Sequence, residues 1–372
     1  MQHMEKLENM TINEIPSLTW NWMKLNRDKI TLNGAFCPAQ AEILNAGKGI
    51  RVEEGSPSEA TGLNFASGIF NAKNPKLTDG HPHFDFVTED KNHPAEALFA
   101  DSKYSKTVRI TGKQEKPLII NFSKEESQAN LTYIIAEENS ESTVVFVYEG
   151  NAPESIFRAK ILAKENSKIH IAKVQLSGKE SLHLDDTGVI ARDGAEVRFT
   201  QLELGGRHVD SGLGVILEGY KSKFTSEVAY ICKKDQLLDM NHIVYHTGKK
   251  SECQMKVNGT LLDGASKTYR GTIDFKKGCA GAKGNEIEEV LLLSPKAVNK
   301  SIPVILCDEE DVEGEHGATI GRLSKEVLFY MQSRGISEAE AEKIMSRAKI
   351  QAAASLLPDE DIKEKINAFL NI

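Results

Sequence analysis

The chain has 372 residues, of which 40% are hydrophobic and 27% charged, a balance typical of a globular protein with a substantial core. Lys and Arg number 46 against 54 Asp and Glu, a formal net charge of −8, so no global positive field attracts nucleic acid. No apolar stretch reaches the roughly 20 residues of a membrane span, and the first residues show no secretion-signal pattern. The five cysteines form no CxxC pair, which indicates a reducing compartment, so we expect a cytoplasmic protein.

Residues 1–105 predict a mixed helical and irregular N-terminal region. Between Glu5 and Asn45, apolar residues at three-to-four spacing are interrupted by Pro16 and Pro38, which predicts short helices and turns. The following stretch to Tyr104 is rich in Gly, Pro, Asn, Asp and His with weak periodicity, and it predicts irregular chain.

Residues 106–315 predict the core of the fold. Short β-branched or aromatic runs alternate with polar turn clusters that recur roughly every 25 to 29 residues, a period that suggests stacked repeats. Ala163-Lys-Glu-Asn-Ser-Lys-Ile-His-Ile and Ala191-Arg-Asp-Gly-Ala-Glu-Val-Arg-Phe share one form, a small residue, a polar turn and an alternating strand. We expect a right-handed parallel β-helix from Pro117 to about Pro303 with mostly Val, Ile, Leu and Phe inside. A β-sandwich is the alternative, because it also has short strands and regular turns.

Residues 316–372 predict a C-terminal helical module. Ser324 caps a helix that runs to Gln332, and Ser337-Glu-Ala-Glu is a capping box for a second helix. Pro358 opens a last helix. The apolar face of this module exceeds what so small a unit buries, so part of it is expected to bind a partner.

Few residues outside these elements suggest chemistry. The phosphate loop and the dinucleotide motif are absent from the sequence. Loop histidines without ordered carboxylates beside them are expected to be solvated rather than metal-bound; these are His81, His83 and His93. His242 and His246 have zinc-like spacing but lie in a strand pattern, where they would be roughly 13 Å apart, so structural roles are expected. Cys232 and Cys253 are expected to be buried structural thiols.

A cluster of candidate ligands lies between the strand pattern and the helical pattern. Cys307-Asp-Glu-Glu-Asp-Val-Glu-Gly-Glu-His brings a thiol, carboxylates and an imidazole together within ten residues. These are iron-compatible ligand types. A solvated acidic loop before a helix is the alternative interpretation.

Several of these segments resemble one known family. Glu310-Asp-Val-Glu-Gly-Glu-His-Gly-Ala-Thr-Ile-Gly-Arg-Leu, followed by Leu328-Phe-Tyr-Met-Gln-Ser-Arg-Gly-Ile, is similar to the signature of the SufB/SufD iron–sulfur cluster assembly proteins. Tyr269-Arg-Gly-Thr-Ile and Leu291-Leu-Leu-Ser-Pro-Lys-Ala resemble strand motifs upstream of it, and Leu18-Thr-Trp-Asn-Trp resembles an N-terminal motif.

The resemblance implies a right-handed parallel β-helix between N-terminal and C-terminal helical parts. It also implies a cytoplasmic complex with a SufC-like ABC-type ATPase, which hydrolyses the ATP, and with a SufB-like paralogue or a second copy of this chain. A transient iron–sulfur cluster would form at the subunit interface, so no tightly bound cofactor is expected in the isolated chain. His316 matches the interface histidine and is the candidate metal ligand, with Glu315 beside it. The expected ATPase-binding residues are Leu328, Phe329, Tyr330, Arg334, Ile344 and Met345.

The resemblance favours the SufD-like role. Glu288 stands where SufB has a cysteine proposed to receive sulfur, and a carboxylate cannot perform thiol chemistry. Gly314 stands where some SufD proteins have a cysteine, whereas the Glu315–His316 pair is a SufB-like feature. We therefore expect a non-catalytic scaffold with no catalytic residue. A SufB-like homodimeric scaffold, or a β-helix protein that binds or cleaves polysaccharide, remains the alternative.

Overall fold

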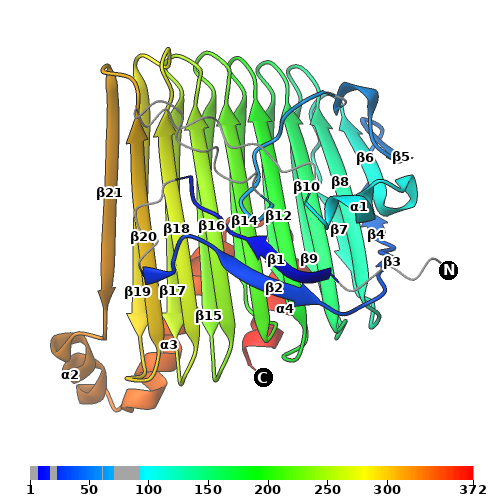
Figure 1. The fold of residues 1–372 in the computed structure, drawn as a ribbon. Coiled ribbons are helices and arrows are strands. Elements are labelled where there is room, and N and C mark those ends of the chain that lie inside the picture. Colours follow the sequence, from blue (N-terminus) through cyan, green and yellow to red (C-terminus); the bar gives the residue numbers. More distant parts are fainter. Residues whose placement is uncertain (1–6, 17–22, 61, 71–92, 372) are drawn as a thin grey trace.

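The computed structural model describes residues 7–16, 23–60, 62–70 and 93–371, and its centre is a parallel β-solenoid of about eight turns (Figure 1). Each turn gives one strand to each of two facing sheets. Sheet I contains the even-numbered strands β6 (Ser105–Ile110), β8 (Gln128–Ala136), β10 (Glu154–Ala163), β12 (Leu182–Ala191), β14 (His208–Leu217), β16 (Leu237–His246), β18 (Ser266–Phe275) and β20 (Val298–Cys307). Sheet II contains the odd-numbered strands β7 (Leu118–Phe122), β9 (Glu141–Tyr148), β11 (Lys168–Gln175), β13 (Glu196–Glu203), β15 (Lys223–Cys232), β17 (Glu252–Leu261), β19 (Ala282–Leu292) and β21 (Val312–Gly321).

Neighbouring strands within these sixteen are all parallel and in continuous register. Side chains at paired positions therefore stack in columns that point either between the sheets or away from them. The inward columns are mostly Val, Ile, Leu and Phe, as in the contact of Phe122 with Phe157, whose ring centroids are 4.6 Å apart. The expected parallel β-helix is confirmed, because a sandwich of antiparallel sheets would show the opposite pairing.

The N-terminal region differs from the short helices expected of it. Its described part contains the antiparallel pair β1 (Leu7–Ile12) and β2 (Asp28–Leu32), and only one α-helix, α1 (Glu96–Phe99). Two 3-10 turns, Ser58–Ala60 and Ser102–Tyr104, also lie in that part. The apolar side chains in this region pack on the outside of sheet I, and this tertiary contact overrides the local pattern.

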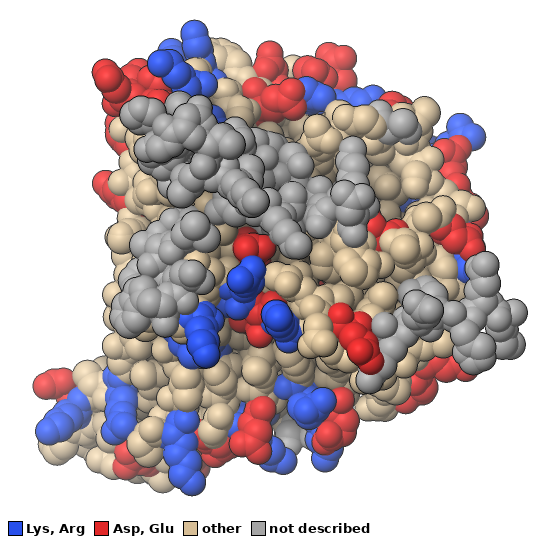
Figure 2. All heavy atoms as spheres, in the orientation of Figure 1, with Lys and Arg blue, Asp and Glu red and all other residues tan. Residues whose placement is uncertain are grey.

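Glycines in sheet I allow residues 62–70 to lie directly on its outer face. A Cβ added at Gly214 would lie 2.4 Å from the Ala66 carbonyl carbon, and one at Gly212 would lie 2.6 Å from the Ile69 nitrogen. Asp186 fixes the same segment by accepting hydrogen bonds from the backbone N–H groups of Gly68 and Ile69. Charged side chains on this face of the molecule are mixed in sign rather than gathered in one basic patch (Figure 2).

The first turn of the solenoid is closed by antiparallel strands. β5 (Ile50–Glu54) pairs with β6, and β4 (Glu42–Leu44) pairs with β7, both antiparallel. A further short strand, β3 (Cys37–Pro38), pairs with β8.

Three helices follow the solenoid: α2 (Lys325–Ser333), α3 (Glu338–Ala354) and α4 (Glu360–Leu370). The expected capping box is confirmed, since the Ser337 side chain accepts from the Glu340 N–H and the Glu340 carboxylate accepts from the Ser337 N–H. Apolar residues of α3 and α4 cover part of the outer face of sheet II. Strand β21 crosses residue 316, so the solenoid continues past the expected start of the helical module. Within the described residues, no helix has the length and apolarity needed to cross a bilayer.

The histidines and thiols that the sequence singled out are mostly structural. His242 and His246 are fully buried in β16, where the His246 ring stacks on Phe275 with centroids 4.8 Å apart. Burial raises the pKa of the Cys232 thiol, and separately that of Cys253, to about 12, in keeping with inert thiols. The expectation of a solvated His93 is wrong, because this ring is buried against Phe70 and accepts the Ala95 N–H. His81 and His83 lie outside the described residues.

Candidate functional site

The last turn of the solenoid, formed by β20 and β21, is its open end. Within the described chain, β20 pairs only with β18 and β21 pairs only with β19. In β21 every residue from Glu313 to Ile320 is exposed. An unpaired strand edge offers free backbone N–H and C=O groups, so it is a template on which a further strand can add.

His316 lies in the middle of β21, and its side chain belongs to an inward column. It is paired in register with Glu286 of β19. Glu286 is buried and points across the interior, because a Cβ added at Gly271 in the opposite sheet would lie 2.0 Å from its Oε1. Paired residues of a parallel sheet point to the same side. The imidazole therefore faces the open end of the solenoid, and no described turn of the solenoid lies beyond it.

Glu315 does not share this position with His316. Adjacent residues of a strand point to opposite faces, and Glu315 points outward, where its Oε2 accepts a hydrogen bond of 3.2 Å from Asn285 Nδ2. Glu313 also points outward and pairs with Lys283 Nζ at 2.8 Å. The sequence grouped these carboxylates with the histidine, whereas the structure separates them across the strand.

Cys307 is at the end of β20 and also belongs to an inward column, since it pairs with the core residue Phe275. Its side chain is exposed, with Sγ 3.0 Å from the Glu309 carbonyl oxygen. Gly314 precedes His316 by two residues on β21, the strand that follows Cys307. A Cβ added at Gly314 would lie 2.9 Å from Phe275 Cε2. The thiol and the imidazole therefore share the mouth of the solenoid but occupy different levels of it.

A buried charged cluster lies one turn below this mouth. Lys267 of β18 forms an ion pair with Glu288 of β19, and both side chains are almost completely buried. Burial raises the pKa of the nearby Glu286 carboxyl to about 7, and the negative charge of Glu288 adds to this effect. Sequence reasoning considered Glu288 only as a lost thiol and missed Glu286 and Lys267. The alternating acids at positions 286 and 288 were the available signal, since a strand places both on one face.

Helix α2 projects from the solenoid next to β21, beside the open end (Figure 1). Apolar side chains of α2 and α3 are left uncovered there. Helix α2 has no buried residue, and Phe329 and Tyr330 are 73% and 60% exposed. Ile344 on α3 is also exposed, and the Arg334 guanidinium lies 5.4 Å from the centre of the Tyr330 ring. Leu328 and Met345 are half-buried. The expected docking residues are thus accessible in whole or in part.

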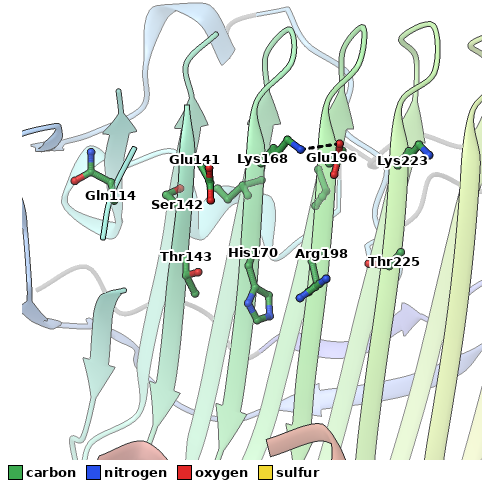
Figure 3. Close-up of a pocket in the computed structure, with 12 residues that line it drawn as sticks. Gln114, Glu141, Ser142, Thr143, Lys168, His170, Glu196, Arg198, Lys223 and Thr225 are labelled. Carbon is green, nitrogen blue, oxygen red and sulfur yellow. Dashed lines mark ion pairs between the residues drawn. The ribbon is translucent and has the colours of Figure 1, made fainter. Parts of the chain in front are cut away.

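A shallow groove of about 370 Å³ crosses the outer face of sheet II (Figure 3). Its carboxylates are engaged in ion pairs, Glu196 with Lys168 at 3.1 Å and Glu141 with Lys113 at 2.9 Å. Burial, and then the charge of Arg198, lower the pKa of His170 in this groove to about 4. A glycosidase needs two carboxylates free to act as acid and as base or nucleophile, and this groove offers a ladder of paired charges instead.

Comparisons with known proteins agree with this geometry. The family described as "SUF system FeS cluster assembly, SufBD core domain" matches residues 119–349. The chain is 24% identical over 252 residues to the iron-sulfur cluster assembly protein SufD of Bacillus subtilis (strain 168), covering 66% of this chain and 58% of that protein. It is also 24% identical over 256 residues to SufB of the same organism, covering 67% of this chain and 55% of that protein.

A third relative is the iron-sulfur cluster assembly SufBD family protein ABCI8, chloroplastic, of Arabidopsis thaliana. It is 24% identical over 305 residues, which cover 77% of this chain and 54% of the relative. The chain thus spans just over half the length of each of these relatives. The family match includes the turns that carry Glu288 and His316. The chain therefore belongs to the SufB/SufD family, of which it is a SufD-like member.

Proposed function

We propose that this protein is a non-catalytic scaffold subunit that assembles iron–sulfur clusters in a cytoplasmic complex of the SUF type. The observation that carries the proposal is the open last turn, where His316 faces the mouth of the solenoid from the middle of an unpaired edge strand. A neutral imidazole is a competent iron ligand, and a single imidazole cannot hold a cluster. The remaining ligands then come from a second chain, and the cluster is a transient cargo at the interface.

The second chain is a SufB-like paralogue that pairs with the open edge of β20 and β21. Exposed apolar side chains on this edge, such as Val298 and Ile320, support pairing there. A second copy of this chain could occupy the same edge and give a SufB-like homodimer. Glu288 argues for the paralogue, because this carboxylate neutralises Lys267 and supplies no thiol for sulfur transfer.

A SufC-like ABC-type ATPase binds the helical surface made by α2 and the exposed side of α3, and ATP hydrolysis belongs to that partner. Phe329, Tyr330 and Ile344 support this assignment, because three large apolar side chains remain exposed on a module whose opposite face is buried on sheet II. The positions of Leu328, Arg334 and Met345 agree with the same surface.

The test is to co-express the protein with its SufB-like and SufC-like partners and to measure iron and sulfide per complex. We expect His316→Ala to leave the complex assembled and to lower its iron–sulfur content several-fold. His170→Ala, a histidine on the outer face of sheet II, is the matched control and should keep the cluster. Unchanged cluster content in an intact His316→Ala complex would show that the ligands lie elsewhere.

A further inference from the structure

Three candidate ligands meet on the outer face of sheet I, beneath the N-terminal strand β2. They are Asp28 at the start of β2, and His208 and Asp210 on β14. One ligand atom from each lies within 4.8 Å of the other two, and His208 Nε2 is 3.1 Å from Asp210 Oδ2. The N-terminal region and the middle of the solenoid, 180 residues apart in the chain at Asp28 and His208, thus contribute to one cluster.

Asp210 is the best evidence that the cluster binds a ligand. Its side chain is 0% exposed, and neither of its carboxylate oxygens accepts a hydrogen bond of normal geometry. A carboxylate so deeply buried needs a compensating cation or several hydrogen bonds. The imidazole of His208, two residues away on the same strand, faces it.

The charges around Asp210 do not balance. Asp239 of β16 is paired in register with Asp210, so the two buried carboxylates are neighbours on adjacent strands. Arg270 of β18 forms an ion pair with Asp239, and Asn13 Nδ2 donates to the same carboxylate at a distance of 2.5 Å. Three carboxylates, those of Asp28, Asp210 and Asp239, therefore share one guanidinium and one imidazole. With all three ionised, even a protonated His208 leaves an excess of one negative charge.

We propose that Asp28, His208 and Asp210 bind one divalent first-row transition-metal ion, which fastens β2 to the outer face of the solenoid. An imidazole nitrogen with two carboxylate oxygens suits Zn²⁺, Mn²⁺ or Fe²⁺ better than Mg²⁺ or Ca²⁺, which prefer all-oxygen sites. Ligand atoms about 2.1 Å from a tetrahedral ion lie about 3.4 Å apart. The donors, which now lie within 4.8 Å of one another, would therefore need to close by up to about 1.4 Å. The double positive charge would cancel the excess negative charge of the cluster.

This site is separate from the proposed cluster interface. β14 lies inside sheet I, with β16 and β18 between it and the open strand β20. The ion has a structural role, since it joins β2 to the turn of the solenoid that this strand covers. The inference therefore does not depend on His316 or on any partner protein.

The experiment measures binding of Zn²⁺, Co²⁺ and Mn²⁺ to the metal-stripped full-length protein by titration calorimetry. All proteins carry His316→Ala, which removes the exposed histidine of the open end as a competing ligand. We expect one equivalent of at least one of these ions to bind, visible absorption bands of a low-symmetry site with Co²⁺, and a rise in Tm. Asp28→Asn and Asp210→Asn should each abolish that equivalent, while Asp235→Asn, in an exposed turn, should not.

Asp28→Asn is the decisive variant, because Asp28 is only half-buried and its loss leaves the rung intact. Hydrogen exchange supplies a second measurement: the metal should slow exchange in β2 of the parent protein and not in Asp28→Asn. The proposal would be overturned if both Asp variants still bound one equivalent of metal ion, or if the parent protein bound none of the three ions. The cluster would then be an internal pair of protonated His208 with Asp210.

Discussion

Glu288 and Lys267 form an ion pair inside the solenoid in which the two side chains are 4% and 0% exposed. The Lys267 ammonium also lies 5.6 Å and 5.9 Å from the ring centres of Tyr269 and Tyr230. Burial lowers the pKa of Lys267, and the charge of Glu288 opposes that shift. Glu288 thus acts as the counter-ion of a buried lysine.

Replacing Glu288 by Ala should destabilise the fold by about 3 to 5 kcal/mol, because it leaves a buried ammonium without a partner. Urea unfolding followed by circular dichroism measures the loss. The double variant Lys267→Met with Glu288→Leu is the control, and it should recover most of the stability since it removes both charges. A double variant as unstable as the single one would show that lost packing, and not the unpaired charge, dominates.

Gly259→Ala should be among the most damaging single substitutions in the solenoid. A Cβ at this position would lie 1.9 Å from Cζ of Tyr230, the residue paired with it on β15, so the buried ring would have to move. Overpacking typically costs about 1 to 3 kcal/mol, and the upper end is expected here because the added atom would overlap a buried ring. The thermal midpoint measures the effect.

The control for Gly259→Ala is Gly317→Ala, because an added Cβ there has no atom within 4 Å. Combining Gly259→Ala with Tyr230→Val should restore stability in part. Equal Tm values for the Gly259 and Gly317 variants would contradict the close contact between the ring and the backbone of β17.

Glu203 should make the protein less stable as the pH rises from about 5 to 8. Burial, and then the charge of Asp185, raise the pKa of this carboxyl from 4.5 to about 8. The native state holds the proton in this interval while the unfolded chain has released it, so unfolding becomes easier with increasing pH. One such proton corresponds to a slope of at most about 1.4 kcal/mol per pH unit.

Urea unfolding of Glu203→Gln at pH 5.5, 6.5 and 7.5 tests this dependence. The amide keeps a polar group beside Gln201, whose Nε2 donates to the Glu203 carboxylate at 2.6 Å, and it cannot ionise. The variant should lose most of the slope, whereas Glu196→Gln at an exposed position should keep it. An unchanged slope in Glu203→Gln would assign the pH dependence to other groups.

Asp186→Ala should release residues 65–70 from sheet I. The carboxylate accepts hydrogen bonds from Ser67 Oγ at 2.7 Å and from the Gly68 and Ile69 N–H groups at 3.0 and 3.1 Å. Hydrogen exchange should accelerate at least about tenfold in that segment, since each charge-assisted hydrogen bond contributes about 1.5 to 3 kcal/mol. Asp193→Ala, which removes an exposed acceptor for the Tyr220 N–H, should leave the segment protected. Equal exchange in the two variants would contradict the anchoring role.

The solenoid was predictable from sequence because its repeat is local. Turns between rungs recur with a residue in left-handed conformation, as at Asn139, Asn166 and Gly194, and each precedes an alternating strand. The N-terminal strands were not predictable from local patterns. β1 and β2 pair although 15 residues separate them in the sequence, and their apolar residues pack on sheet I. β21 was missed for a similar reason: its glycines and glutamates are typical of a loop, and only parallel pairing with β19 makes it a strand.

In the candidate site, too, residues in a local motif could be predicted from the sequence, whereas contacts between distant segments could not. The family signature located His316, but strand geometry decided that Glu315 faces away from it. The cluster of Asp28, His208 and Asp210 joins residues far apart in the chain, and no local pattern marks it. Glu286 and Lys267 were missed because charged residues in a strand pattern normally face solvent.

The antiparallel strands at the first turn limit how many molecules can join in a row. β4 and β5 run against the direction of the rungs they cover, so within the described chain the solenoid cannot continue in register at that end. A stack of parallel strands that ends in antiparallel ones offers parallel continuation only at its other end, here β20 and β21. If a second molecule adds in parallel to β20 and β21, as proposed, the antiparallel first turn provides no matching parallel edge for a third, which favours a closed pair over a fibre.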